Sequence, residues 1–221
     1  MKGLLIKDIR LMRSQGTLLL GLLVIVAIFM GLVSDVSPSF VVTYITIFLS
    51  VFTATTISYD EYDNCYLFLM TLPITRKKYV NEKYVFGILI TLAAWVIGMV
   101  IGTVMLITQN TGISEAEWII SSLMSIFIAI VFMSVIMPIR FKFDGEKARY
   151  ANIIVMGAIL AVAFGASKLI DYIPGHITES AEKFFAALGD NGIVVLSAVI
   201  AVAALLLSYI CSRRIMAKKE F

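Results

Sequence analysis

The sequence predicts an all-α polytopic membrane protein with six transmembrane helices and one further helix at the membrane surface. Composition is the first observation behind this prediction. Of the 221 residues, 60% are hydrophobic and 15% are charged, whereas soluble domains carry about 25% charged residues. The second observation is that solidly apolar, charge-free stretches fill most of the chain, and each is long enough to cross a bilayer as a helix. An ordinary soluble enzyme, a nucleic-acid-binding module and a secreted disulfide scaffold are excluded.

The charge-free stretches give six spans within a single domain, residues 1–221. The expected spans are residues 15–34, 38–59, 84–108, 118–139, 150–167 and 192–212. The first span is expected to be retained, because its apolar run is longer than the roughly 7–15 residues of a cleaved signal peptide.

Basic residues predict the orientation of the spans. Of the 18 Lys and Arg residues, two lie in the loop 168–191. The remaining 16 lie in the N-terminal arm, the loops 60–83 and 140–149, and the C-terminal tail. The positive-inside rule therefore places both termini in the cytoplasm and the loop 168–191 outside the cell membrane. The basic face also suits contact with anionic membrane lipid.

Residues 1–14 have the pattern of a short amphipathic helix. Leu5, Ile9 and Met12 recur at helical spacing, and Asp8 and the basic residues occupy the other positions. This pattern predicts a helix lying in the cytoplasmic interface. The alternative is a positively charged flank that only orients the first span.

The loop 60–83 is expected to form two helices with a break between them. Asp60, Glu61 and Asp63 place negative charge at the start of the first helix, where the helix dipole favours it. Pro73 ends that helix, and Thr75 is suited to cap a second one that runs into the third span. The first helix carries an apolar cluster that needs a protein partner or the lipid interface: Tyr66, Leu67, Phe68, Met70 and Leu72.

Missing motifs narrow the function. The chain has no G-x-x-x-x-G-K-[ST] loop, so it is not expected to bind ATP in that way or to be an enzyme by itself. Its expected spans contain no Asp, Glu, Lys, Arg or His, which argues against a proton-coupled carrier. Cys65, Cys211 and His176 are too isolated for a metal site. If this protein moves a substrate, the energy comes from another chain.

Two patterns within the spans have alternative interpretations. A hydroxyl stripe in the second span either lines a translocation path or holds helices together: Thr43, Thr46, Ser50 and Thr53. Small residues four apart allow close helix approach, within the chain or between two copies: Gly98 and Gly102, and Gly157, Ala161 and Gly165.

The external loop 168–191 is expected to contain a short helix over residues 179–188. Thr178 would cap this helix and Gly189 would end it. The helix is either a gate at the exit or an element resting on lipid.

At the loop 60–83 the chain resembles the permease subunits of ABC-2 type exporters. That family carries acidic residues followed by a segment like L-P-I-[ST]-R-x-x-Y-V-x-x-K. The matching residues here are Leu72, Pro73, Ile74, Thr75, Arg76, Tyr79, Val80 and Lys83. The opening L-L-I-K-D-I-R-L at residues 4–11 is similar to the start of small ABC-2 permeases, including exporters of phenol-soluble modulins and other amphipathic peptides.

The resemblance implies a type V-like exporter fold and a mechanism. Two permease copies would sit on two cytoplasmic ATPase subunits, which bind ATP and magnesium. The loop 60–83 would be the coupling element and the loop 140–149 a second, smaller contact. The implied coupling residues are Glu61, Asp63, Tyr66, Phe68, Leu72, Pro73, Thr75 and Arg76. The expected substrate is an amphipathic or antimicrobial-type peptide; the alternatives are ion efflux, bacteriocin immunity, or a structural or receptor protein without transport.

Overall fold

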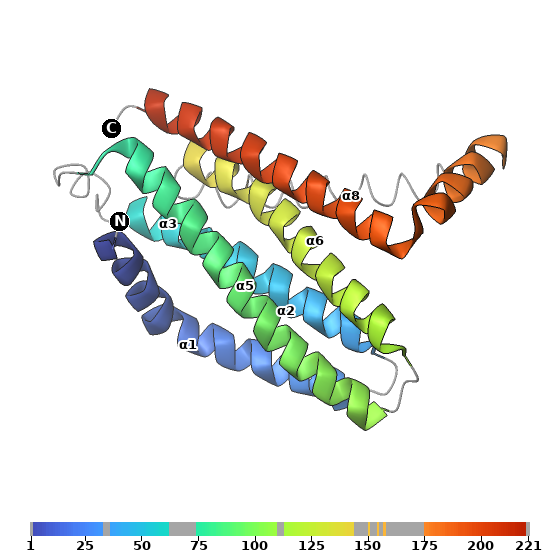
Figure 1. Ribbon diagram of the computed structural model, residues 1–221. Helices are drawn as coiled ribbons and strands as arrows, with labels where there is room; N and C mark the ends of the chain where they lie inside the picture. Colours follow the sequence, from blue (N-terminus) through green and yellow to red (C-terminus); the bar gives the residue numbers. More distant parts are fainter. Residues whose placement is uncertain are drawn as a thin grey trace.

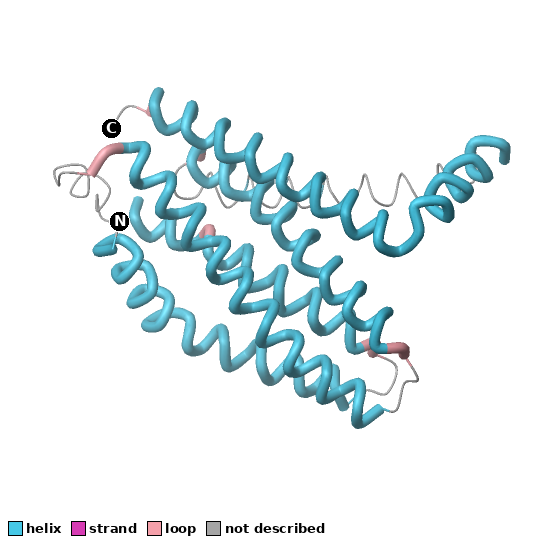
Figure 2. The backbone as a smooth tube through the Cα atoms, in the orientation of Figure 1, coloured by secondary structure: helices cyan, strands magenta, loops and turns pink. Residues whose placement is uncertain are grey.

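The described part of the chain is helical. A computed structural model describes residues 2–32, 36–61, 74–109, 113–143 and 175–219, with the single residues 150, 154 and 157. The helices are α1 (Lys2–Leu32), α2 (Pro38–Thr53), α3 (Thr55–Glu61), α5 (Arg76–Gln109), α6 (Glu115–Lys142) and α8 (Gly175–Lys218). Apart from the first part of α8, which projects outward, they run lengthwise in one elongated bundle (Figure 1), and helix accounts for nearly all of the described backbone (Figure 2). The predicted all-α class is confirmed.

Four helical stretches are long and apolar enough to cross a membrane. They are Pro38–Asp60, Arg76–Gln109, Glu115–Lys142 and Leu188–Lys218, with mean hydropathies of 1.9, 2.4, 2.6 and 2.8. Each contains or closely matches one expected span. The expected span 15–34 falls mainly within α1, and most of the span 150–167 lies outside the described residues. The count of six spans therefore stays a prediction.

Local capping chemistry fixes several helix ends. The Lys78 amide donates to the Thr75 hydroxyl at 3.3 Å, so the predicted cap of α5 is confirmed. At the start of α6, Ser114 and Glu117 form a reciprocal capping box, which satisfies two otherwise unpaired amides. Between α2 and α3 the helix is interrupted at Ala54, where neighbouring threonine hydroxyls bond to carbonyls three residues back. Such bonds compete with the helix ladder and bend it.

The core forms where α2 packs against α5 and α6. Its two buried clusters are centred on Tyr79, Met133 and Met137 and on Val41, Ile45 and Ala94.

The glycine pair of α5 permits this contact. A Cβ atom on Gly98 would lie 3.3 Å from the Val42 Cα, and one on Gly102 would lie 2.6 Å from the Trp118 ring. The pair therefore packs within the chain, in agreement with the intramolecular alternative. Of the second small-residue series only Gly157 is described, and a Cβ atom there would meet nothing within 4 Å.

The helix α8 changes direction at Gly189, where φ is 61° and ψ is 177°. Glycine adopts this backbone without a Cβ clash, and Figure 1 shows the two parts of α8 (orange and red) inclined to each other. The predicted break at Gly189 is confirmed. The predicted start at residue 179 is wrong, because α8 already begins at Gly175. No proline lies between that residue and Gly189 to interrupt the helix.

Candidate coupling site at the basic end of the bundle

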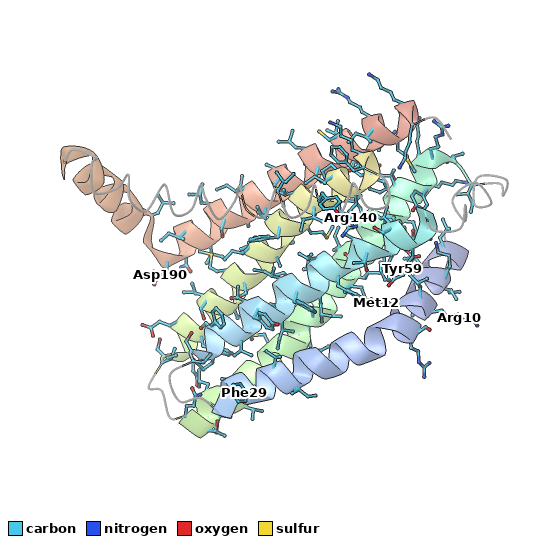
Figure 3. All side chains as sticks on the ribbon, turned by 180° about the vertical axis from the view of Figure 1, so that it is seen from behind. Arg10, Met12, Phe29, Tyr59, Arg140 and Asp190 are labelled. Carbon is cyan, nitrogen blue, oxygen red and sulfur yellow. The ribbon has the colours of Figure 1, made fainter. Side chains whose placement is uncertain are left out.

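One end of the bundle, here called the basic end, collects positively charged side chains. There α1 and α5 begin and α6 and α8 finish (Figure 1). In Figure 3 Arg10 and Arg140 lie at this end, away from Phe29 and Asp190. The helix termini there carry Lys7, Arg10, Arg13, Arg76, Lys77, Lys78, Arg140, Lys142, Arg213, Arg214 and Lys218. The fold thus brings together basic segments that are far apart in the sequence.

A buried ion-pair cluster joins three helices at this end. The Lys83 ammonium lies 2.5 Å from Asp8 Oδ2 and 2.8 Å from Asp60 Oδ2. The Lys7 ammonium contacts Asp60 Oδ1 and lies 3.2 Å from Asp8 Oδ1. Because Asp8 is on α1, Asp60 on α3 and Lys83 on α5, two positive and two negative charges bind these helices to one another.

Hydrogen bonds complete the coordination of Lys83. Its ammonium also donates to Thr56 Oγ1 at 3.1 Å and lies 5.4 Å from the centroid of the Tyr79 ring. The Tyr79 hydroxyl donates to Asp60 Oδ2 at 2.8 Å. A lysine ammonium has three donors, and those of Lys83 are matched by Asp8, Asp60 and Thr56.

The opposite charges attract one another, and this attraction offsets the hydration that each charge loses on burial. Asp8 and Lys83 are fully buried, and an isolated charge there would lose several kcal/mol of hydration. Burial acts to lower the pKa of the Lys7 ammonium, but attraction and hydrogen bonds from Asp60 and Asp8 outweigh it and raise this pKa above its ordinary value. Lys7 therefore keeps its charge throughout the physiological pH range.

Glu82 is a further acid beside this cluster. Its side chain is fully buried, and within the described part of the chain neither carboxylate oxygen has a hydrogen-bond partner. When Glu82 is ionised, the group of five residues carries one negative charge in excess.

The cluster lies at both ends of the predicted coupling loop, because Asp60 is the first residue of that loop and Lys83 the last. Thr75 and Arg76 are brought to the start of α5, where the Arg76 guanidinium donates to the carbonyls of Met216 at 3.3 Å and Ala217 at 3.0 Å. Glu61 is the final residue of α3. The other predicted coupling residues lie outside the described residues: Asp63, Tyr66, Phe68, Leu72 and Pro73.

Two sequence-based expectations about this end are wrong. Asp60 and Glu61 do not begin a helix; they end α3, where Lys7 and Lys83 compensate the charge of Asp60. Asp8 does not lie on an exposed polar face. The N-terminal helix instead turns Leu4 and Asp8 toward the bundle, where Asp8 pairs with Lys83.

The sequence offered only a weak signal for the cluster. Asp8 is the one acid within a basic arm, and Lys83 directly precedes a charge-free span. Local periodicity does not show that the two residues meet, since 75 positions separate them.

The hydroxyl stripe lies inside the helix packing. Thr46, Ser50 and Thr53 are fully buried. Ser50 donates to the Ala129 carbonyl at 3.3 Å and accepts from Thr91 at 3.1 Å, and the Thr43 hydroxyl lies 2.7 Å from that of Ser125. These contacts match the alternative in which the stripe holds helices together; a role in translocation stays a prediction.

Comparison with known proteins assigns the chain to a family. The profile of the ABC-2 family transporter protein matches residues 3–217, whereas no curated protein and no solved structure matches the chain. The matched region contains the whole ion-pair cluster and three of the four stretches that are long and apolar enough to cross a membrane, and it covers all but the last residue of the fourth. With apolar helices of transmembrane length and a family match over nearly its full length, this chain is a multi-pass membrane protein that belongs to the ABC-2 transporter family.

Proposed function

We propose that this protein is the permease subunit of an ABC exporter and that it couples to its ATPase through residues 60–83. The observation that carries the coupling proposal is the cluster of Lys7, Asp8, Asp60 and Lys83. It holds both ends of the loop against the first helix. A displacement of the loop therefore reaches α1, α3 and α5 together.

The physical basis of this coupling is rigidity. Buried polar groups that hydrogen-bond one another favour one arrangement of the side chains that carry them. Here Tyr79 adds a hydrogen bond to Asp60, and Phe141 packs edge-on against the Tyr79 ring at 6.2 Å between centroids. Motion at the loop would thus be passed to α6 as well, with little lost in local deformation.

The functional unit would contain two permease copies and two ATPase subunits, with ATP and magnesium bound by the ATPases. The basic end would face the cytoplasm, as the positive-inside rule requires. The apolar cluster at residues 66–72 would then meet the ATPase, because it is rimmed by charge as partner interfaces are.

The proposed substrate is an amphipathic peptide. The expected spans carry no Asp, Glu, Lys, Arg or His, so a path along them offers apolar surface and hydroxyl groups. Such a surface suits a substrate with both apolar and polar faces better than a small ion, which needs charged or densely polar ligands.

The coupling proposal is tested by removing two aromatic side chains of the loop. Tyr66→Ala with Phe68→Ala should weaken binding of the purified ATPase about 30-fold, since truncated aromatic anchors cost about 2 kcal/mol or more. Phe40→Ala removes an aromatic ring that is exposed at the start of α2, outside both expected ATPase contacts, and serves as the matched control. Unchanged ATPase affinity and unchanged ATP turnover in the double variant would show that the loop is not the coupling element.

The substrate proposal needs a separate measurement. Proteoliposomes containing permease and ATPase should accumulate a fluorescent amphipathic helical peptide only when ATP is present. A scrambled peptide of the same composition, which lacks an apolar face, is the control. Equal transport of both peptides, or stimulation of ATP hydrolysis by inorganic ions alone, would contradict an amphipathic substrate.

A further inference from the structure

Glu82, in the second turn of α5, is a buried acid that the ion-pair cluster does not satisfy. Its side chain is fully buried, and in the described part of the chain neither of its carboxylate oxygens accepts a hydrogen bond. No ammonium or guanidinium of the described residues forms an ion pair with it either. By contrast, the carboxylates of Asp8 and Asp60 each pair with both Lys7 and Lys83. Buried polar groups without a partner are rare in folded proteins, so Glu82 calls for a physical explanation.

The cations that act on Glu82 are already paired with other acids. The charged groups with the strongest effect on it are Lys83 of its own helix, Asp8 and Lys7 of α1, and Asp60 of α3. These two positive and two negative charges bind one another in the ion-pair cluster. Lys83 has no donor left for Glu82, because its three donors are matched within the cluster. An ionised Glu82 would therefore be a third negative charge without a cation of its own.

The two forms of a carboxyl group differ greatly in the cost of burial. A buried carboxylate without a counter-charge loses its hydration and gains no contact in return, and such a group takes up a proton instead. The carboxylates of Asp8 and Asp60 add repulsion, which acts in the same direction. Protonation of Glu82 removes the charge, so both effects disappear.

We propose that Glu82 is a proton-binding site of the folded protein and that the bound proton stabilises the junction of α1, α3 and α5. With the proton in place, the junction contains two positive and two negative charges. When the proton leaves for solvent, the Glu82 carboxylate competes for the ammonium groups of Lys7 and Lys83 and weakens their bonds to the two aspartates. The junction is thus firm at mildly acidic pH and looser at alkaline pH. This inference concerns the present chain alone and does not depend on the ATPase or on the substrate.

Infrared spectroscopy detects the proton directly, because the carbonyl band of a protonated carboxyl is separate from the bands of carboxylates. Purified full-length protein in detergent should show such a band at about pH 6, where exposed carboxyls are ionised. Glu82→Gln should lack this band. Glu115→Gln, which removes an exposed acid at the start of α6, should keep it. In the unmodified protein the band should fade reversibly as the pH is raised to about 9. A band that is absent from the unmodified protein, or that survives in Glu82→Gln, would overturn the proposal.

The stability of the protein should also depend on this proton. In the unfolded chain a glutamate releases its proton near about pH 4.3, so unfolding above that pH releases the proton of Glu82 and stability falls as the pH rises. From about pH 5 up to the pH at which the folded protein loses the proton, the unfolding equilibrium constant of the unmodified protein should increase about tenfold more per pH unit than that of Glu82→Gln. Titration with a denaturing detergent measures this constant, and Glu115→Gln should follow the unmodified protein.

Two results of the stability measurement would contradict the proposal. The first is a parallel pH dependence of the unmodified protein and Glu82→Gln, because a proton released on unfolding must separate the two curves. The second is a Glu82→Gln variant that fails to fold at about pH 6, where the proposal keeps Glu82 neutral at a pH above the usual range of a carboxyl group. Glutamine has the size of the protonated acid and, like it, carries no charge.

Discussion

Lys83 contacts a carboxylate on α1, a carboxylate and a hydroxyl on α3, and an aromatic ring on its own helix. Removing this residue leaves Asp8 and Asp60 buried with a single remaining ammonium, that of Lys7. Breaking a buried ion pair by deleting one partner is far more costly than never forming it, since the remaining charge has lost its hydration.

Lys83→Met should therefore lower the free energy of unfolding by about 3–5 kcal/mol. Lys78→Met is the matched control, because Lys78 is an exposed lysine of the same helix and exposed charges contribute about 1 kcal/mol or less. Thermal unfolding of both variants in detergent provides the measurement. Equal melting temperatures would mean that the cluster does not support the fold.

Replacement of Glu82 should have the opposite effect on stability. Glu82→Gln keeps the size of the side chain and removes a buried negative charge that has no hydrogen-bond partner in the described ranges. The melting temperature should stay the same or rise by a few degrees. Glu115→Gln, at an exposed position in the first turn of α6, should change it little. A marked loss of stability in Glu82→Gln would contradict this prediction and would show that the charge of Glu82 supports the fold through Lys83.

At the scale of the helices, tight packing depends on positions without a side chain. The α2–α5 contact requires Gly98 and Gly102 beside Val42, and Trp118 of α6 covers Gly102. A Cβ atom at Gly102 would lie within 2.8 Å of both Val42 and Trp118. A side chain added at this position would therefore push α5 away from α2 and α6.

Gly102→Ala should lower the free energy of unfolding by about 1–3 kcal/mol, the usual cost of overpacking. Gly21→Ala is the control, since a Cβ atom there meets nothing within 4 Å and alanine is the better helix former by about 1 kcal/mol. The two variants should thus shift the melting temperature in opposite directions. A stabilised Gly102→Ala would require that α2 and α5 be further apart than described.

Features that depend on a few neighbouring residues could be predicted from the sequence. The cap at Thr75, the break at Gly189 and the close approach at Gly98 each follow from local backbone chemistry. The rotation of the N-terminal helix could not be predicted in this way. Leu5, Ile9 and Met12 gave an apolar face, but the preference of Asp8 for Lys83 decided which side turned inward, and periodicity contains no information about such a partner.

At the scale of the whole molecule, the direction of each helix places its basic end on the same side of the bundle. The basic ends of α1, α5, α6 and α8 meet on one side of the bundle (Figure 1). The acidic first turn of α6, with Glu115 and Glu117, is at its opposite end. This separation is what the positive-inside rule produces in a membrane protein.

The orientation can be tested with one native and one introduced cysteine. Cys211 is free, exposed and near the basic end, so it should react with a membrane-impermeant maleimide only after the cells are opened. Glu115→Cys, at an exposed site in the first turn of α6, should react in intact cells. Labelling of Cys211 in intact cells would reverse the topology.

The ion-pair cluster also sets an order of events during synthesis. Asp8 leaves the ribosome 75 residues before Lys83, an interval of about 4–15 s at roughly 5–20 residues per second. Throughout that interval the nascent chain has no ammonium on α5 to accept this carboxylate, and burial without it is too costly. The turn of α1 that carries Asp8 can therefore reach its final buried position only after Lys83 has been made, so docking of the amino-terminal end reports that the chain has been translated beyond the start of α5.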